Sequence, residues 1–514
     1  MMLFFLIALL IFAGLLAWIS ERAGSNWPRW VALGTLFAGL CAVGIEGSRL
    51  VRGVPNSSHS WLTEMTLPWI TRFGISLHLA MDGLSWILVC LTFLIGLIAV
   101  MASWSEITQR IGFFHFNILW TLAGIVGVFV SLDLFAFFVF WELMLVPMYL
   151  LISLWGHEHR SYAATKFFLF TQAGGLLMLI SILALSITHT RQTGVITFDY
   201  FALLETRLDP TTEFWLMLGF FLAFAVKLPA VPLHPWLPDA HTEAPTGGSI
   251  ILAGLLLKTG AYGLLRFALP LFPHASHTIA VGAMALGVAG ILYGALLAFS
   301  QNDFKKLIAY SSIAHLGFVL LGIYAGNTHA MQGAVVAMVA HALSTGALFM
   351  IAGLLQERLH TRDMRRMGGL WPIVPKLSGV TLFFSMASLG IPGLANFIGE
   401  FLILLGTYRA NIPLAVLATI GVVGAALYSL ILIQRAFHGK NTEGWSVPDL
   451  GPAQLSTLGI LMVLSVGLGL YPQPLLNASR PAVTQIKTFA SAFPVEERTS
   501  SLDGPPKPSR YATR

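Results

Sequence analysis

Four ionisable side chains lie inside stretches of the sequence that are otherwise continuously apolar: Glu142, Lys227, Lys258 and Glu400. Each costs about 2.5–3.5 kcal/mol to place at the centre of a bilayer. Two acids and two bases suit a proton or ion pathway, because burial favours the neutral form of each group and a nearby opposite charge restores the charged form. A structural ion pair is the alternative, but well-packed apolar side chains usually serve stability as well or better.

Polar residues between these charges could extend such a pathway. His315 (in SSIAHLG) and His341 (in VAHALSTG) fall in apolar segments between Lys258 and Glu400 in the sequence. A histidine titrates near neutrality and can shuttle a proton, although a single membrane histidine serves equally well as a hydrogen-bonding contact between helices. The presence of two favours a relay. Further candidates are Gln172, His234, Tyr310, Ser344 and Tyr428. His234 could instead cap the helix break that precedes it.

Prolines interrupt the apolar segments that carry charges, at Pro147, Pro229 and Pro392. A proline inside a helix removes a hydrogen bond and breaks the helix. Pro229 should therefore leave the carbonyl of Ala225, close to Lys227, without its usual partner. Such breaks supply polar backbone and room for water at the depth of the charges.

The remaining residues do not support metal or nucleotide chemistry. Cys41 and Cys90 are too far apart for an iron–sulfur or zinc site. His157 belongs to a His-Glu-His run without ligand spacing, and two prolines lie between His234 and His241. The sequence contains no phosphate-binding loop and no dinucleotide fingerprint. We therefore expect no metal and no bound cofactor on this chain, and a solvated loop at His157.

Composition identifies the elements that must hold the buried charges. The chain has 514 residues, of which 56% are hydrophobic and only 10% charged, whereas soluble chains average about 25% charged. Helices cross a bilayer with about 20 apolar residues, and continuous apolar runs argue against a β-barrel. We expect fourteen spans, at 1–20, 30–48, 84–104, 113–132, 134–155, 165–187, 212–230, 247–269, 278–299, 307–324, 330–355, 376–408, 412–434 and 453–472.

Basic residues predict how these spans are oriented. Lys and Arg are about twice as frequent in the odd-numbered loops as in the even-numbered ones, and cytoplasmic loops carry this excess. Both termini are therefore expected on the periplasmic side, with the first helix retained. The basic stretch 357–369 is expected to be an orientation signal and a surface helix, or a docking surface for a neighbouring subunit. Scattered basic residues do not indicate nucleic-acid binding, and the polar chain after 478 is expected to form no core.

The seventh and twelfth predicted spans share a pattern. A Phe-Phe pair stands before Pro229 in one (FFLAFAVKLP) and before Pro392 at the same separation in the other (FFSMASLGIP). An odd number of crossings separates the two copies, so they should have opposite orientation. Interrupted helices in corresponding positions of two inverted halves indicate a transport site near the middle of the membrane.

Four motifs resemble the proton-translocating, antiporter-like subunits of respiratory complex I. They are AVKLPAVPLHPWLPDAHTEAPTGGS (225–249), LLLKTGAYGLLR (255–266), FWELMLVPMYLLI (140–152) and IAYSSIAHLGF (308–318). The resemblance covers about residues 60–475, and the first motif is highly specific. The same family includes subunits of multi-subunit Na+/H+ antiporters and membrane-bound hydrogenases. A glutamate at position 400, where most relatives have lysine, and the absence of extra C-terminal spans favour the M-type branch.

The resemblance implies an all-α polytopic fold of about fourteen helices with two inverted five-helix repeats, formed by spans 4–8 and 9–13, and with broken helices 7 and 12. It divides the chain into five parts. They are N-terminal helices with an external loop (1–112), a first repeat (113–269), a second repeat (278–437), helix 14 (438–477) and a polar tail (478–514).

The resemblance also implies an input pair, a central relay, two linking histidines and an output. These would be, in that order, Glu142 with Lys227, Lys258, His315 with His341, and Glu400. Such subunits belong to NADH:quinone oxidoreductase of the bacterial inner (plasma) membrane, beside L- and N-like neighbours, and flavin, iron–sulfur clusters and quinone lie in partner subunits. Moving one charge against 100 mV costs about 2.3 kcal/mol, so the chain needs those partners. The alternatives are an antiporter or hydrogenase subunit and a purely structural scaffold.

Overall fold

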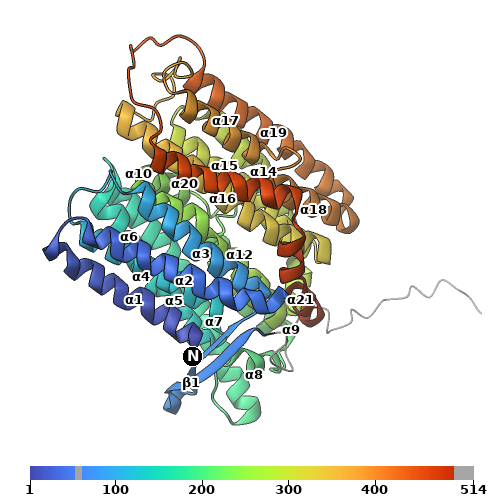
Figure 1. Ribbon diagram of the computed structural model, residues 1–514. Coiled ribbons are helices and arrows are strands. Elements are labelled where there is room, and N and C mark those ends of the chain that lie inside the picture. Colours follow the sequence, from blue (N-terminus) through green and yellow to red (C-terminus); the bar gives the residue numbers. More distant parts are fainter. Residues whose placement is uncertain (52–60, 491–514) are drawn as a thin grey trace, which may run out of the picture.

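The computed structural model describes residues 1–51 and 61–490. Within these residues, twelve helices are long and apolar enough to cross a membrane, and they form one bundle of roughly parallel helices (Figure 1). The uninterrupted ones are α1 (Met2–Ser20), α2 (Trp27–Val51), α3 (Gly83–Ala102), α4 (Ile111–Val130), α7 (Arg160–Thr193), α14 (Pro273–Ser300), α15 (Phe304–Tyr324), α16 (Thr328–Leu359), α19 (Ile412–Phe437) and α20 (Pro452–Leu470).

The seventh and twelfth predicted spans are interrupted, as the prolines predict. The first of them consists of α9 (Pro210–Lys227), an irregular turn and α10 (Trp236–Glu243), which is a short helix. The second is divided into α17 (Pro375–Leu389) and α18 (Ala395–Ala410). Counted with the twelve, these two segments complete the fourteen expected passes within the described residues. The all-helical membrane fold with broken helices 7 and 12 is therefore confirmed.

The break after α9 does not leave a free carbonyl where the sequence places one. The N–H of Ala230 donates to the carbonyl of Ala225 at 2.8 Å. The expectation that Pro229 leaves this carbonyl without a partner is therefore wrong. The chain turns more widely after Lys227, so the next available N–H replaces the one that proline lacks.

The eighth span is irregular although no proline interrupts its middle. Two segments in it are π-helical, and such turns are rare and frequent at functional sites. The charged lysine of this span lies in the short α-helical part between them. In chain order the segments are α11 (Thr246–Ile251), a π-helix (Leu252–Leu256), α12 (Leu257–Gly263), a second π-helix (Leu264–Ala268) and α13 (Leu269–Leu271).

The odd-numbered loops gather on one end of the bundle, which we call the loop face (residues 21–26, 103–110, 156–159, 244–245, 301–303, 360–374 and 438–451). The guanidinium of Arg29 donates to the carbonyl of Ile107 at 2.9 Å, and that of Arg362 to the carbonyl of Thr242 at 2.5 Å. After α16 ends at Leu359, the basic stretch forms turns. The surface helix expected at 357–369 is therefore wrong, because the helix ends at Leu359 and Arg362 in the turns that follow bonds to the backbone of the seventh span.

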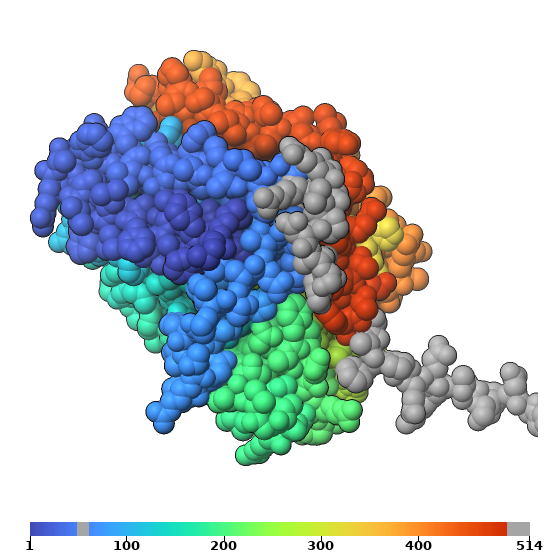
Figure 2. All heavy atoms as spheres, turned by 60° about the horizontal axis from the view of Figure 1, so that its bottom comes forward, coloured from blue at the N-terminus to red at the C-terminus, as the bar shows by residue number. Residues whose placement is uncertain are grey.

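The opposite end, the hairpin face, carries an antiparallel β-hairpin that the all-α expectation lacks. Its strands are β1 (Thr63–Ile70) and β2 (Ile75–Met81). The hairpin packs beside the segment that holds α8 (Tyr200–Leu204) (Figures 1 and 2). Alternating apolar and polar residues, too few to cross a membrane, are typical of such a half-buried hairpin.

The polar chain after 478 includes half of a packed helix, α21 (Gln473–Ala490), on the hairpin face. Leu475, Val483 and Ile486 are buried, and their helical spacing gives the helix one apolar side. The Gln332 side chain donates to the carbonyl of Leu476 at 3.1 Å. The expectation that this chain forms no core is wrong up to residue 490, and its remainder (491–514) lies outside the described residues.

Corresponding helices of the two five-span sets pack in the same way. In the first set α4 packs against α5 (Leu134–Leu143) and α7 against α9; in the second, α14 packs against α15 and α16 against α18. α5 continues as α6 (Leu145–Trp155) after a turn at Met144. The charged residues thus lie at the breaks of helices that neighbouring helices enclose.

Candidate functional site

The centre of the site is a contact between a lysine and a histidine on two different spans. Lys258 Nζ lies 2.7 Å from Nδ1 of His341 and also donates to the carbonyl of Ala253 in the first π-helix. Both side chains are almost completely buried, with exposed fractions of 0% and 1%. When the lysine is an ammonium it donates to Nδ1, so the proton of neutral His341 resides on Nε2. That nitrogen has no hydrogen-bond partner.

A second histidine continues from this contact. The ring centroids of His341 and His315 are 5.7 Å apart, which one water molecule or a ring rotation can bridge. His315 Nδ1 lies 2.9 Å from Oε1 of Glu400. Its Nε2 lies 2.9 Å from the hydroxyl of Ser388 and 3.1 Å from that of Tyr428. The structure therefore joins Lys258, His341, His315 and Glu400, which lie on four different spans, in one chain of titratable groups.

The break between α17 and α18 leaves space for the Glu400 carboxylate. Gly390 has a φ of +83°, a left-handed conformation that favours glycine. A Cβ atom at Gly390 would lie 3.1 Å from Oε2 of Glu400. The left-handed turn and the missing side chain together leave room for the buried carboxylate.

Glu142 and Lys227 lie at the other end of the constellation, and they do not form the direct pair that the sequence suggests. Neither Oε1 of Glu142 nor Nζ of Lys227 has a hydrogen-bond partner. The ammonium instead lies 5.0 Å from the ring centroid of Trp141, a cation–π distance. The two charges still act on each other electrostatically. The structure therefore shows this pair in a separated arrangement.

Small residues position both of these side chains. A Cβ atom at Gly175 of α7 would lie 2.5 Å from Oε1 of Glu142, and the amide of Gln172 on the same helix lies beside this carboxylate. A Cβ atom at Gly260 would lie 3.2 Å from Cβ of Lys227. The helix that holds Lys258 therefore packs directly on the one that holds Lys227.

Three of the sequence candidates lie outside this chain of contacts. Ser344 donates to the carbonyl of Ala340 in its own helix at 3.0 Å. His234 has its ring centroid 5.2 Å from that of Tyr293, and Tyr310 lies near the same tyrosine. Pro147 falls in the first turn of α6, just after the turn at Met144 that follows the Glu142 helix. Its place agrees with the expected break.

Sequence reasoning missed two buried titratable residues near the loop face. Lys305 is 0% exposed and donates to the carbonyl of Ala244 at 3.1 Å. His241 is also 0% exposed, its ring stacks on Phe349 with centroids 4.4 Å apart, and neither ring nitrogen has a partner. A lysine at the start of a span resembles an ordinary topology signal, so composition alone could not separate it from surface charges. Among residues 1–51 and 61–490, no group of three His, Cys, Asp or Glu side chains could hold a metal ion.

Comparison with known proteins shows which family carries this arrangement. A family model described as "NADH:quinone oxidoreductase/Mrp antiporter, TM" matches residues 131–427. NADH-quinone oxidoreductase subunit M of Pseudomonas aeruginosa is 53% identical over 501 residues, covering 96% of this chain and 98% of that protein. This chain belongs to the family of M-type, antiporter-like subunits of NADH-quinone oxidoreductase. The M-type subunit of Escherichia coli K12 is 52% identical over 504 residues, covering 95% of this chain and 98% of that protein.

Solved structures share the fold of this chain. A chain of respiratory complex I from Thermus thermophilus superimposes with a TM-score of 0.83 at 31% identity, covering 95% of this chain and 99% of that one. A chain of the Mrp complex from Dietzia sp. DQ12-45-1b reaches a TM-score of 0.80 at 22% identity, covering 96% of this chain and 55% of that one, which shows the shared fold alone. The M-type chain is thus a multi-pass membrane subunit of a bacterial NADH-quinone oxidoreductase. The resemblance read from the sequence motifs is confirmed.

Proposed function

We propose that this M-type chain moves protons through a relay of buried side chains. In order, its members are Glu142, Lys227, Lys258, His341, His315 and Glu400. The observation that carries the proposal is the series of neighbours from Lys258 to Glu400. Lys258 Nζ lies 2.7 Å from Nδ1 of His341, the two histidine ring centroids are 5.7 Å apart, and Nδ1 of His315 lies 2.9 Å from Oε1 of Glu400. Buried hydrogen-bonding groups in a membrane mark proton relays when they are linked in this way.

Each transfer in the relay conserves charge and protons. The Lys258 ammonium gives its proton to Nδ1 of His341, which becomes an imidazolium and leaves a neutral amine behind. The imidazolium releases its Nε2 proton toward His315, and His315 passes a proton from Nδ1 to the Glu400 carboxylate. The hydroxyls of Ser388 and Tyr428 hold the other nitrogen of His315. Glu142 and Lys227 control the first step. When the two side chains close into a pair, the carboxylate compensates the positive charge of Lys227, which otherwise repels the Lys258 ammonium.

The proposed orientation of the chain determines which side of the membrane each end of the relay faces. The loop face, richer in Lys and Arg, would be cytoplasmic, and both termini would be periplasmic. The relay would divide between the repeats 113–269 and 278–437, with L- and N-like subunits and lipid at its sides. Flavin, iron–sulfur clusters and quinone would reside in partner subunits, with no cofactor on this chain. Electron transfer there would supply the energy that reloads the relay.

Substitution of the input residues tests the proposal. In the assembled complex, Glu142→Gln and Lys227→Ala should sharply reduce NADH:quinone activity coupled to proton movement. NADH oxidation by an artificial acceptor should persist, because that reaction does not pass through the membrane subunits. Normal coupled activity in a correctly assembled variant would refute the roles of these residues. Cation/proton exchange in vesicles without NADH would instead favour the antiporter reading.

A further inference from the structure

A buried histidine on the hairpin face lies between two carboxylates. Nδ1 of His78 lies 2.5 Å from Oδ2 of Asp199, and Nε2 of the same ring lies 3.0 Å from Oε1 of Glu64. A neutral imidazole has one N–H, whereas an imidazolium has two. Only the protonated ring can therefore donate to both carboxylates. The geometry of the cluster requires the charged form of His78.

The electrostatics of this cluster agree with its geometry. Burial lowers the pKa of His78, but the hydrogen bonds and charges of Asp199 and Glu64 outweigh burial and raise it. Burial likewise opposes the ionised form of Asp199, but the hydrogen bond and charge of His78 lower the pKa of that carboxyl. The charged groups on the elements packed against β2 are Glu64, Arg72, Asp82, Asp133, Asp199 and the amino terminus at Met1.

The strand that carries His78 also touches the helix that carries Glu142. Asp133 precedes α5 and caps it, and its carboxylate accepts the N–H of Ser76 in β2 at 2.9 Å. The carbonyl of His78 accepts the N–H of Leu132 at 2.8 Å. A displacement of β2 therefore reaches the start of the helix that holds the input acid of the proposed relay.

The end of the same strand is joined to the span that carries Lys258. β2 ends at Met81, and the next residue is Asp82. The Asp82 carboxylate accepts a hydrogen bond from Arg266, which lies in the second π-helix of that span. Both side chains are buried, and buried ion pairs fix the register of the elements that they join. The hairpin thus holds the π-helix that follows Lys258.

A row of aromatic side chains provides a second connection between His78 and Arg266. The ring centroids of His78 and Phe201 are 6.1 Å apart, and those of Phe201 and Trp61 are 6.2 Å apart. The Arg266 guanidinium lies 5.1 Å from the ring centroid of Trp61, a cation–π distance. Packed side chains of this kind transmit a displacement from one element to another.

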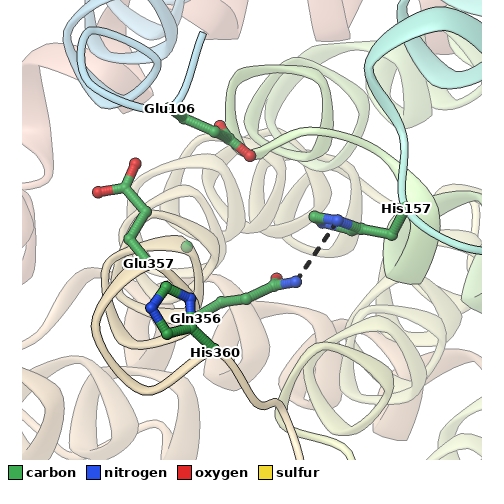
Figure 3. A pocket seen from close by; sticks show the side chains of 6 residues that line it. Glu106, His157, Gln356, Glu357 and His360 are labelled. Atoms are coloured by element: carbon green, nitrogen blue, oxygen red, sulfur yellow. Dashed lines mark hydrogen bonds between the residues drawn. The ribbon is translucent and has the colours of Figure 1, made fainter. Parts of the chain in front are cut away.

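A histidine on the loop face behaves differently. His157 lies in a polar pocket of about 290 Å³, beside the amide of Gln356 (Figure 3). Burial, together with the charges of Lys305 and Arg362, lowers the pKa of His157 to about 3. His157 is therefore neutral near pH 7, whereas the charge of His78 changes above the ordinary histidine pKa of about 6.5.

We propose that protonated His78 clamps the hairpin and holds the Lys258 span in its relay position, so that the pH on the hairpin face controls the coupling of electron transfer to proton movement. The inference rests on the proposed function. When His78 releases its proton to water, two carboxylates face a ring with one N–H, and β2 loosens. Asp82 then no longer fixes Arg266, and the second π-helix shifts. Lys258 leaves His341, and electron transfer moves fewer protons.

The experiment measures protons moved per electron pair in proteoliposomes of the complete complex, with the pH set separately inside and outside. In the proposed orientation the hairpin face lies inside, because added NADH reaches only complexes whose NADH site lies outside. The proton yield should fall as the inner pH rises through the pKa of His78. The driving force alone acts in the opposite sense, since an alkaline interior receives protons more readily. A yield that ignores the inner pH, or follows the outer pH, overturns the inference.

Glu64→Gln tests the clamp without removing the histidine. An opposite charge this close raises a histidine pKa by about 1–3, and Glu64 is partly exposed. The midpoint of the transition should therefore move to lower pH by about one pH unit. Glu205→Gln removes an exposed carboxylate at the end of α8 and is the matched control, with an unchanged midpoint. Equal midpoints in the two variants overturn the inference.

His78→Gln removes the titrating group itself. Its proton yield should stay low at every inner pH, and a transition that persists in this variant overturns the inference. If His78→Gln does not assemble, the midpoint of Glu64→Gln decides the question. Glu400→Gln, measured in parallel, separates the two proposals. If it lowers the yield while the hairpin variants match their control, the clamp fails alone; if it is silent, the relay itself fails.

Discussion

The ammonium of Lys258 lies 2.7 Å from Nδ1 of His341, and two π-helical segments of one span flank the lysine. A relay role requires the lysine to lose its proton, whereas a structural role requires only its charge. Arginine keeps the charge but cannot be deprotonated in proteins. Lys258→Arg should therefore reduce coupled NADH:quinone turnover nearly as far as Lys258→Met. Normal turnover in the arginine variant would show that Lys258 is a fixed charge.

The contact between His315 and Glu400 predicts a loss when the carboxylate becomes neutral. Glu400→Gln keeps the size of the side chain but removes a charge-assisted hydrogen bond, which contributes about 1.5–3 kcal/mol. If that energy supports the transfer step, proton movement should slow by roughly tenfold or more. Stopped-flow measurement of proton release by vesicles tests this. Glu400→Asp, which keeps the charge, is the control and should retain most of the rate.

Gly175 predicts an effect at a residue that carries no chemistry. A Cβ atom there would lie 2.5 Å from Oε1 of Glu142, so Gly175→Ala must displace the carboxylate. Coupled activity should fall although every titratable group remains. Gly282→Ala is the matched control, because a Cβ atom at that position meets nothing within 4 Å. Equal coupled activity of the two variants would mean that the position of the Glu142 carboxylate does not affect proton movement.

The hairpin should loosen as pH rises through the raised pKa of His78. His78 lies 2.5 Å from Asp199 and 3.0 Å from Glu64. Burial lowers the pKa of His78, but hydrogen bonds and the charges of Asp199 and Glu64 outweigh burial and raise it. The stability that the imidazolium contributes is fully present below the ordinary histidine pKa of about 6.5 and is lost as pH rises through the raised value.

Hydrogen exchange of the hairpin amides in 63–81 checks this expectation. Exchange should accelerate as pH rises above the raised pKa of His78, beyond the ordinary acceleration seen elsewhere in the chain. His78→Gln should exchange rapidly at every pH and show no transition. A transition that persists in the glutamine variant would assign the effect to another group.

A buried ion pair on the hairpin face predicts a large loss of stability. Arg266, in the second π-helix, donates to Asp82, which also caps α3, and both side chains are buried. Removal of one partner from such a pair costs about 3–5 kcal/mol. Arg266→Met should lower the thermal stability of the assembled complex. The double variant Asp82→Asn with Arg266→Met should recover part of the loss, because no unpaired charge then remains.

The buried charges and the broken helices could be found in the sequence because each departs from its surroundings. Glu142 and Lys258 are charges in apolar runs, and prolines mark the breaks after Lys227 and before Glu400. The π-helices around Lys258 leave no such mark, since they depend on packing against neighbouring helices. Lys305 lies where spans ordinarily begin with a basic residue, so its burial is visible only in three dimensions.

Other features of the fold were harder to recognise, because polar residues dominate the segments that form them. The apolar residues of α21 recur at helical spacing, although polar residues outnumber them. His157 lies in a polar loop that the structure folds over Lys305. The separation of Glu142 from Lys227 could not be foreseen, because the sequence shows that two charges share a depth and not whether they touch.

The number of protons moved per electron pair tests the central claim most directly. It should be measured in proteoliposomes of the complete complex, unmodified and with Lys258→Arg. If the buried relay of this chain carries protons, the assembled variant moves fewer protons per electron pair than the unmodified complex. An unchanged ratio, with this chain assembled and electron transfer intact, would contradict the account.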